Sequence, residues 1–242
     1  MPNPTAAILI IGDEILTGRT REGNAHYLAG ELVKVGIDLR QIRVISDDHA
    51  TIVAAVRELS ASHDQLFTSG GIGPTHDDIT ADAVAEAFGA SLDVRDDARA
   101  ILAAHYAARG VEFTAARLRM ARIPEGATLI DNPVSGAPGF SIGNCHVMAG
   151  VPNIFQAMVT GLLPKLTGGQ PLMSRNWMVM VPEASIADQL RALAETHPEV
   201  SFGSYPFVQE GHYGTNLVAR ATDAAALEAG FSALQTAFPE GK

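Results

Sequence analysis

The sequence contains few of the residues that disulfide frameworks and nucleic-acid or membrane interfaces require. Cys145 is the single cysteine among 242 residues, which excludes an internal disulfide and favours a reducing, cytoplasmic location. The only lysines are Lys34, Lys165 and Lys242, and the formal net charge is -10. Nucleic acid and anionic membranes bind through clustered basic residues, so neither is expected as a partner.

Long hydrophobic runs and targeting signals are also missing. The apolar run from Ala6 to Ile11 is much shorter than the roughly 20 residues of a membrane span. Met1 to Thr5 carries no basic region of a signal peptide. Hydrophobic residues nevertheless make up 47% of the chain, which is enough to bury a substantial core. We therefore expect one large domain, or one large domain with a small companion.

Several catalytic motifs are absent. No G-x-x-x-x-G-K-[ST] string occurs, which excludes a P-loop NTPase. The eight histidines show no H-E-x-x-H or paired zinc spacing, so catalytic zinc is not expected. His76 stands where a dinucleotide fingerprint has its third glycine, which weakens a Rossmann dehydrogenase interpretation. Gly139 to Gly143 matches G-x-S-x-G, but we reject a nucleophile elbow because a strand is expected after the serine.

The most informative stretch runs from Thr68 to Thr80 and reads TSGGIGPTHDDIT. An apolar run precedes it and a helical pattern follows it, which predicts strand, loop and helix in succession. Glycines let backbone amides approach a ligand closely, and a helix N-terminus behind them favours phosphate. The carboxylates of Asp77 and Asp78 would repel phosphate unless a cation such as Mg²⁺ lay between them. The stretch is consistent with a metal-assisted phosphate or pyrophosphate site, or with a Gly-Pro turn and an aspartate N-cap that need no ligand.

The first half of the chain alternates strand and helix patterns. Apolar runs of strand length occupy Ala6 to Ile11, Ile37 to Ile45 and Leu66 to Thr68. This alternation predicts an α/β fold with a three-layer, doubly wound, mostly parallel sheet. Ligands of such sheets bind at the carboxyl ends of the strands, which is where Asp13 and Glu14 would lie.

Less regular patterns give further expectations. In the second expected strand, the alternation of apolar and polar positions shifts by one residue at Gln41, which indicates a bulge or mixed burial. Asp47 or Asp48 is expected to cap the helix that follows. Residues 91–121 are predicted to be helical. The residues expected to face inward there are Ile101, Leu102, His105 and Tyr106. A second glycine turn, Ala149 to Asn153, opens another helix, and it either faces the first loop across one cleft or is simply a helix cap.

The C-terminal part of the chain follows a linker from Leu166 to Pro171. Its patterns read strand, helix, strand, strand and helix, which predicts a small ferredoxin-like α+β domain. We therefore expect two domains, residues 1–168 and 172–242. The second carries no cluster of catalytic residue types, so it is expected to pack, dimerise or cover the cleft, and the protein to be a homo-oligomer.

Three segments resemble, in the right order, motifs of the molybdopterin-binding (MoaB/Mog-like) domain, in the form found at the N-terminus of the competence/damage-inducible protein CinA. One is the glycine-rich stretch described above. The others are Gly12 to Gly18, with Asn24 following, and Asn132 to Phe140. The resemblance covers about residues 5–165. It implies a domain that binds molybdopterin or a nucleotide, followed by a small CinA-like accessory domain.

The resemblance also implies roles for individual residues. Asp77 and Asp78 would hold a divalent metal, Mg²⁺ or Co²⁺, and take part in catalysis. A phosphorylated pterin, with molybdopterin as a candidate, or an adenine nucleotide would occupy the pocket. The residues implied in phosphate or ligand binding are Ser69, Gly70, Gly71, Gly73, Thr75, Asp13, Glu14, Asn24, Gly136, Gly150 and Pro152.

Relatives of this kind imply two activities. Some bind or adenylylate molybdopterin, whereas CinA-type domains look like metal-dependent ADP-ribose pyrophosphatases; both reactions occur at a phosphoanhydride. The turn from Ala149 to Phe155 departs from the CinA pattern because it lacks a glutamate, and no deamidase domain follows, so deamidation is not expected. We favour hydrolysis of ADP-ribose-like pyrophosphates. The alternatives are a non-catalytic molybdopterin or nucleotide carrier, an adenylyltransferase-like role in cofactor biosynthesis, and an oligomeric protein with an empty pocket.

Overall fold

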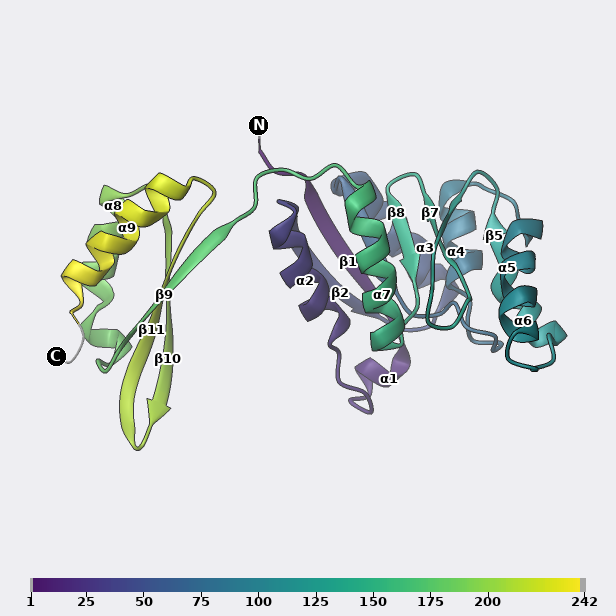
Figure 1. The fold of residues 1–242 in the computed structure, drawn as a ribbon, viewed down its shortest axis with the longest axis horizontal. Helices are drawn as coiled ribbons and strands as arrows, with labels where there is room; N and C mark the ends of the chain where they lie inside the picture. Colours follow the sequence, from purple (N-terminus) through teal and green to yellow (C-terminus); the bar gives the residue numbers. More distant parts are fainter. Residues whose placement is uncertain (1, 240–242) are drawn as a thin grey trace. The chain divides into compact units, whose positions relative to one another are not determined.

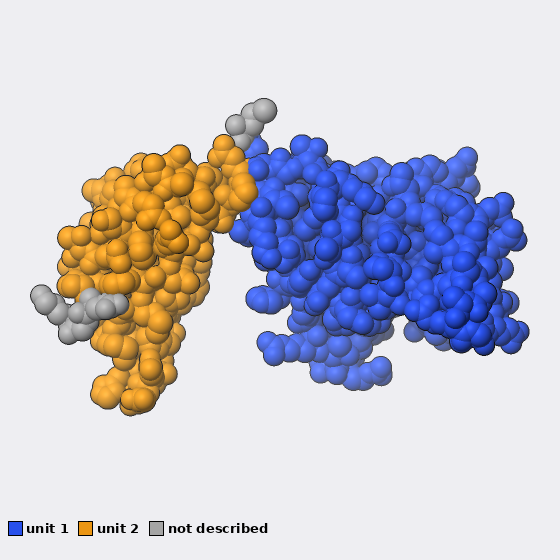
Figure 2. Space-filling view, in the orientation of Figure 1, with its two compact units in different colours: residues 1–169 blue, residues 170–242 orange. Residues whose placement is uncertain are grey.

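The computed structural model describes residues 2–239 and forms two compact units, residues 1–169 and 170–242 (Figures 1 and 2). The boundary between them falls within the linker expected from the sequence. No helix in the described part of the chain combines the length and the apolar character that crossing a bilayer requires.

A six-stranded sheet forms the centre of the first unit (Figure 1). The strands are β1 (Thr5–Ile11), β2 (Asp38–Ile45), β3 (Gln65–Ser69), β6 (Thr128–Ile130), β7 (Gly139–Ile142) and β8 (Cys145–Met148). Their order is β2-β1-β3-β8-β7-β6. The first four strands are parallel, β7 is antiparallel to β8, and β6 is antiparallel to β7. The mostly parallel sheet predicted from the sequence is confirmed.

Helices cover both faces of this sheet and complete three layers. The helices of the unit are α1 (Asp13–Leu16), α2 (Asn24–Lys34), α3 (His49–Ser62), α4 (Thr80–Phe88), α5 (Asp96–Ala107), α6 (Ala115–Leu118) and α7 (Pro152–Leu162), with 3-10 turns η1 (Arg119–Ala121) and η2 (Leu163–Lys165). Ile8 and Ile10 pack towards α2 and α7, whereas Leu9 and Ile11 pack towards α3 and α4. Because successive side chains of β1 point to opposite, covered faces, the strand is apolar at nearly every position.

The start and end of β2 match the local sequence signals. The pairing of β1 with β2 shifts so that Ala6 faces Leu39 and Ala7 faces Gln41, which leaves Arg40 as the extra residue of a bulge. Asp48 then caps α3, because its side chain accepts a hydrogen bond from the Thr51 amide at 2.9 Å.

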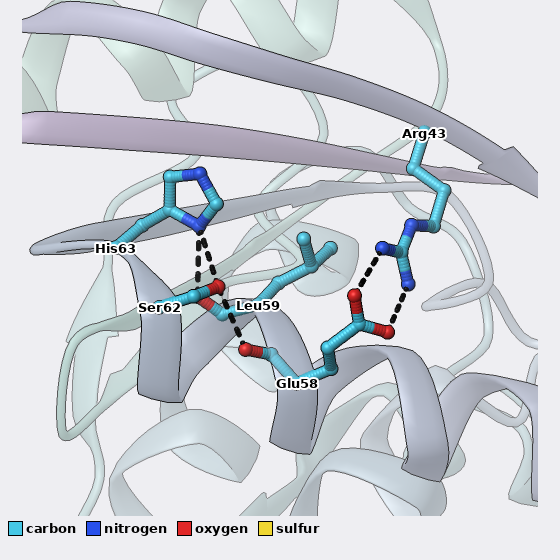
Figure 3. Close-up of polar contacts among 5 residues, drawn as sticks. All are labelled: Arg43, Glu58, Leu59, Ser62 and His63. Atoms are coloured by element: carbon cyan, nitrogen blue, oxygen red, sulfur yellow. Dashed lines mark hydrogen bonds and ion pairs between the residues drawn. The ribbon is translucent and has the colours of Figure 1, made fainter.

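A bidentate ion pair links β2 to α3. Arg43 donates to the two carboxylate oxygens of Glu58 at 2.6 and 2.8 Å (Figure 3). At the end of the same helix the Ser62 hydroxyl donates to the Glu58 carbonyl at 2.8 Å, and Nδ1 of His63 lies 3.1 Å from the Leu59 carbonyl oxygen (Figure 3). Glu58 is exposed, so the pair orients the helix rather than adding much stability.

Residues 91–121 are less helical than the sequence predicts. Leu92–Val94 forms β4, which pairs with β5 (Arg122–Pro124) in a separate two-stranded sheet. The inward orientation predicted for Ile101 was wrong, because its side chain is 42% exposed whereas Leu102 is fully buried. Consecutive helix residues lie about 100° apart, so α5 directs only one of these two neighbours to the core.

The second unit is a small α+β fold. Its elements are β9 (Met173–Val179), η3 (Glu183–Ser185), α8 (Ala187–Thr196), β10 (Ser201–Gln209), β11 (His212–Ala221) and α9 (Ala224–Ala237). The sheet order is β10-β11-β9, and β11 lies antiparallel to both neighbours. β9 and β10 are therefore parallel to each other with α8 between them in sequence, a split β-α-β arrangement. The expected small α+β domain is confirmed, and its neighbouring strands pair antiparallel.

Two residue types that occur once in the chain lie in different units. Cys145 is fully buried in β8, and burial raises the pKa of its thiol. Trp177 lies in β9, and its indole N–H donates to the Phe238 carbonyl at 2.7 Å. The thiol is therefore kept from solution reagents while the first unit is folded.

His146 is a buried, neutral histidine in β8. It is 4% exposed, and its ring nitrogens lie 2.8 Å from the Ser141 hydroxyl and 2.7 Å from the Gln65 side-chain oxygen. Burial lowers the pKa of His146 from 6.5 to about 4. The ring packs beside Phe67 at 5.2 Å between centroids, and this position inside the sheet identifies it as a structural residue.

Candidate functional site

A cavity of about 580 Å³ lies at the carboxyl ends of the parallel strands. Its lining includes residues that directly follow three of them: Gly12 after β1, Gly70 after β3 and Ala149 after β8. Asp47, two residues after β2, also lines it. Open α/β sheets bind their ligands at this edge, so the fold places the cavity where a functional site is expected.

The floor of the cavity is a loop that only glycine can form. Gly70 and Gly71 have φ values of 111° and 69°. A Cβ atom on Gly70 would lie 2.2 Å from the Ile11 carbonyl oxygen, and one on Gly71 would lie 2.1 Å from Oγ1 of Thr80. Thr80 fixes the loop, because its hydroxyl donates to the Gly70 carbonyl and its amide donates to the Gly71 carbonyl, both at 3.0 Å.

The next part of the loop presents free backbone donors. Gly71, Ile72 and Gly73 line the cavity, and within the described residues their amides have no protein acceptor. α4 starts seven residues after Gly73 and has no side-chain cap. Unpaired amides close to a helix N-terminus are suited to anionic oxygens. The unpaired donors make this loop a candidate phosphate site.

The second glycine turn packs against this loop and lines the same cavity. Gly150 and Pro152 are lining residues, and a Cβ atom on Gly150 would lie 3.2 Å from the Gly70 Cα. Pro152 occupies the first turn of α7, which has no side-chain cap. Of the two interpretations that the sequence allows for this turn, the structure shows the shared cleft.

Asn24 holds the two loops together. Its side-chain nitrogen donates to the Ser69 hydroxyl and to the Gly150 carbonyl, both at 2.8 Å. Asn24 and Ser69 are 6% and 3% exposed, and both line a smaller neighbouring cavity. In this structure the two side chains, both predicted to contact the ligand, form a contact that supports the loops from α2.

Replacing Asn24 by alanine is expected to lower the free energy of unfolding by about 2 kcal/mol, because the buried Ser69 hydroxyl and the partly buried Gly150 carbonyl lose their donor. Urea unfolding followed by far-UV circular dichroism measures this change. Asn153→Ala is the matched control, because Asn153 is exposed on α7. Equal stability of the two variants would show that Asn24 does not hold the loops.

Four carboxylates line the cavity: Glu14, Asp47, Asp77 and Asp78. Asp47 accepts a hydrogen bond from the Asp13 amide at 2.9 Å. The pKa of Asp47 is raised, chiefly by burial and further by the negative charges of Asp13, Glu14 and Asp77. The sequence favoured a cap for this pair of acids, and the structure gives the cap to Asp48 and places Asp47 in the cavity.

The aspartates after the glycine loop differ in their surroundings. Oδ2 of Asp78 accepts hydrogen bonds from the Thr75 amide at 2.8 Å and from its hydroxyl at 2.5 Å. The side chain of Asp77 is 67% exposed, and the pKa of Asp77 is lowered because the nearby Thr75 hydroxyl favours the charged carboxylate. Thr75 thus orders the acids and does not itself line the cavity.

Within residues 2–239, no three side chains of His, Cys, Asp or Glu gather closely enough to hold a metal ion alone. Magnesium commonly takes one or two protein carboxylates and completes its shell with water and substrate phosphate oxygens. The hard oxygen donors of Asp77 and Asp78 fit an ion of this kind that arrives with its phosphate ligand. They do not form a preassembled metal cage.

The structure brings together only part of the set of residues predicted to contact the ligand. Those that line the cavity are Glu14, Gly70, Gly71, Gly73, Gly150, Pro152, Asp77 and Asp78. Those that do not are Asp13, Asn24, Ser69, Thr75 and Gly136. Gly136 lies against His105, since a Cβ atom there would be 2.4 Å from the imidazole ring. Its role is to let the turn pass that side chain.

Other lining residues carry weak sequence signals. Asn132 and Ser135 belong to the motif of the third segment, and they border the cavity together with Thr20 and Met120. Met120 lies in η1, in a region that the sequence predicts to be helical. Nothing local marks it, because its approach to the cavity depends on how η1 packs in the folded unit.

The first unit is thus an α/β domain with paired glycine turns around a carboxylate-lined cavity, the arrangement of a molybdopterin-binding fold. Residues 7–168 match the family described as "Probable molybdopterin binding domain". The chain belongs to this family. Residues 171–242 match the family described as "FAD synthase, middle domain".

Individual relatives extend this assignment. The chain is 37% identical over 212 residues to a protein of Pyrobaculum calidifontis, covering 84% of this chain and 81% of that protein. It is 34% identical over 209 residues to a CinA-like protein of Desulfosudis oleivorans, covering 82% of this chain and 51% of the relative. It therefore spans about half the length of that relative.

A solved structure shows the same fold. The crystal structure of the protein CinA, described as of unknown function, from Thermoplasma acidophilum is 34% identical, with a TM-score of 0.61. The match covers 66% of this chain and 98% of that one. The CinA-type resemblance seen in the sequence is confirmed.

Proposed function

We propose that this protein binds a phosphorylated pterin or an adenine nucleotide together with a divalent metal, and that it hydrolyses pyrophosphates such as ADP-ribose. The observation that carries the proposal is that Gly71, Ile72 and Gly73, whose amides have no acceptor among the described residues, line a cavity together with four carboxylates. Membership of the molybdopterin-binding family supports a small-molecule ligand.

In this proposal, different groups of the protein bind the phosphate and the metal. The amides of the glycine loop hold phosphate oxygens, and Asp77 and Asp78 hold the cation. A bound Mg²⁺ or Co²⁺ would neutralise charge on the phosphoanhydride and activate water. Four carboxylates around one cavity repel a free nucleotide, so binding is expected to require the metal.

The alternative is a non-catalytic carrier, or an adenylyltransferase-like protein of cofactor biosynthesis. One observation favours it. The turn after β8 contributes Ala149, Gly150, Val151, Pro152 and Ile154 to the cavity, and none of these is acidic. The second loop therefore supplies no carboxylate that could hold a second metal or a water molecule.

Incubation of the full chain with ADP-ribose and Mg²⁺ or Co²⁺, with AMP release followed by chromatography, tests the proposal. Asp78→Asn is expected to lower the rate at least tenfold, because loss of a group that holds or orients a metal commonly costs roughly 10–100-fold. The amide oxygen of the introduced asparagine can still accept from Thr75, so the loop is expected to keep its shape. Asp93→Asn, an exposed acid in β4, is the matched control.

The outcomes separate the candidates. AMP release that falls in Asp78→Asn and not in Asp93→Asn supports the hydrolase. Thermal stabilisation of the wild type by ADP-ribose that EDTA abolishes, without AMP release, supports the carrier. Equal turnover by both variants would contradict the assignment of Asp78.

A further inference from the structure

A second, smaller cavity adjoins the glycine loop. Five residues line both cavities: Gly71, Ile72, Gly73, Asp78 and Met120. The remaining wall of the smaller one includes Asp82, Arg119 and Arg122. The loop proposed to hold phosphate therefore has acidic and basic side chains close to it on the side of α4 and η1.

Both acids of the smaller cavity already have partners. Arg122 donates to the two carboxylate oxygens of Asp82 at 2.5 and 3.0 Å, and both side chains are about one-third exposed. Asp78 accepts from the amide and hydroxyl of Thr75. Neither carboxylate is therefore paired with Arg119.

The side chain of Arg119 has no protein partner among residues 2–239. The residue is half-buried, and its Nε is completely buried without a hydrogen-bond acceptor. No ion pair or hydrogen bond joins its side chain to another described residue. The two terminal nitrogens of Arg119 have no acceptor either, and unlike Nε they are not buried. An unpaired guanidinium that is held next to the glycine loop and keeps these donors accessible is suited to an anion supplied from outside.

The balance of charge leads to the same conclusion. The main cavity is lined by four carboxylates and by no Lys or Arg. Of the described residues lining the two cavities, only Arg119 and Arg122 are basic, and Arg122 is neutralised by Asp82. The guanidinium of arginine is planar and binds phosphate through two parallel hydrogen bonds.

We propose that Arg119 binds the second phosphate of a diphosphate whose first phosphate lies on the amides of Gly71 to Gly73. The contact makes the site selective for diphosphate compounds over monophosphates. This inference rests on the proposed function, because it takes a nucleotide at the glycine loop as its starting point. It adds Arg119 to the binding site. It also adds a preference for diphosphates over monophosphates, which the glycine loop alone does not provide.

Calorimetric titration of the full chain with AMP and with α,β-methylene-ADP, both with Mg²⁺, tests this proposal. The methylene bridge prevents cleavage, so only binding is measured. The wild type is expected to bind the diphosphate analogue at least tenfold more tightly than AMP. Arg119→Gln is expected to reduce this ratio to below threefold with little change in the affinity for AMP.

Two further variants make the test specific. Arg117→Gln removes the same charge two positions away, where the guanidinium lies 4.7 Å above the Tyr106 ring and donates to the Glu112 carbonyl. It is expected to keep the wild-type ratio. Arg119→Lys keeps the charge without the planar fork and is expected to give an intermediate ratio, so it also tests the contact if the glutamine variant does not fold.

The experiment distinguishes failure of the Arg119 contact from failure of the proposed function. If Arg119→Gln or Arg119→Lys keeps the wild-type ratio, the contact with the second phosphate is wrong and the proposed function stands. If the ratio falls equally in Arg117→Gln, the effect is one of general charge and the contact is again wrong. If the wild type binds neither nucleotide with Mg²⁺ or Co²⁺, the proposed function fails, and the inference fails with it.

Discussion

Replacing Gly70 by alanine is expected to lower the free energy of unfolding by about 4 kcal/mol, because strain and overpacking add at this position. Its φ of 111° is unfavourable for any residue with a Cβ atom. The added carbon would also lie 2.2 Å from the Ile11 carbonyl oxygen. That oxygen belongs to the end of the central strand β1, which is paired on both sides and has little room to move.

Gly89→Ala separates the two contributions. Gly89 ends α4 with a φ of 65°, and a Cβ atom there would meet nothing within 4 Å. Its loss of stability is therefore expected to be only about 1 kcal/mol, from backbone strain alone. Urea unfolding of the two variants, followed by far-UV circular dichroism, measures the difference. Values within about 1 kcal/mol of each other would mean that the loop relaxes and that its shape is not fixed by Ile11.

Acidification from pH 6.5 to pH 4 is expected to remove about 3 kcal/mol of stability through His146, since one pKa unit corresponds to about 1.4 kcal/mol. Burial lowers the pKa of His146 from 6.5 to about 4 in the folded chain. As the pH falls, the unfolded chain takes up the proton first. The stabilisation is complete above about pH 6.5 and is lost progressively towards pH 4.

His146→Gln isolates this contribution, because glutamine stays neutral and can still bond to Ser141 or Gln65. The difference in unfolding free energy between pH 7 and pH 4 is expected to be about 3 kcal/mol smaller in this variant than in the wild type. His26→Gln, at an exposed position of α2, is expected to keep the wild-type pH dependence. The same pH dependence in all three proteins would show that His146 accepts a proton in the folded state.

The sequence predicts those parts of the fold that are encoded locally. The apolar run of β1 predicts a strand covered on both faces, because side-chain alternation is visible in the sequence. The parity change at Gln41 predicts a bulge or mixed burial, and the structure shows the bulge. Gly70 and Gly71 predict a tight loop, because glycine adopts positive φ values more readily than other residues. Both have positive φ in the structure.

Other parts of the site depend on contacts between distant segments. The Ser69 side chain bonds to Asn24, 45 positions earlier, so it supports the loop from below the cavity. No pattern near Ser69 reveals this. The position of Asp47 in the cavity is hidden for another reason. An acid just before a helix is usually read as its N-cap, but here the neighbouring Asp48 provides the cap.

The sequence does not predict the short strands β4 and β5 or the unpaired side chain of Arg119. Three-residue strands are too short to show a period of two, and Leu92–Val94 adjoins a helix whose pattern dominates the window. An arginine is usually a solvated surface residue. What distinguishes Arg119 is the lack of a partner for its buried Nε, which only coordinates can show.

Each compact unit carries its own intrinsic reporter. The only thiol of the chain is Cys145, inside residues 1–169, and the only indole is Trp177, inside residues 170–242. Alkylation kinetics would therefore follow opening of the first unit, while indole fluorescence would follow the second, in the unmodified chain. Comparing the two signals during denaturation would reveal whether the units unfold in one step or independently.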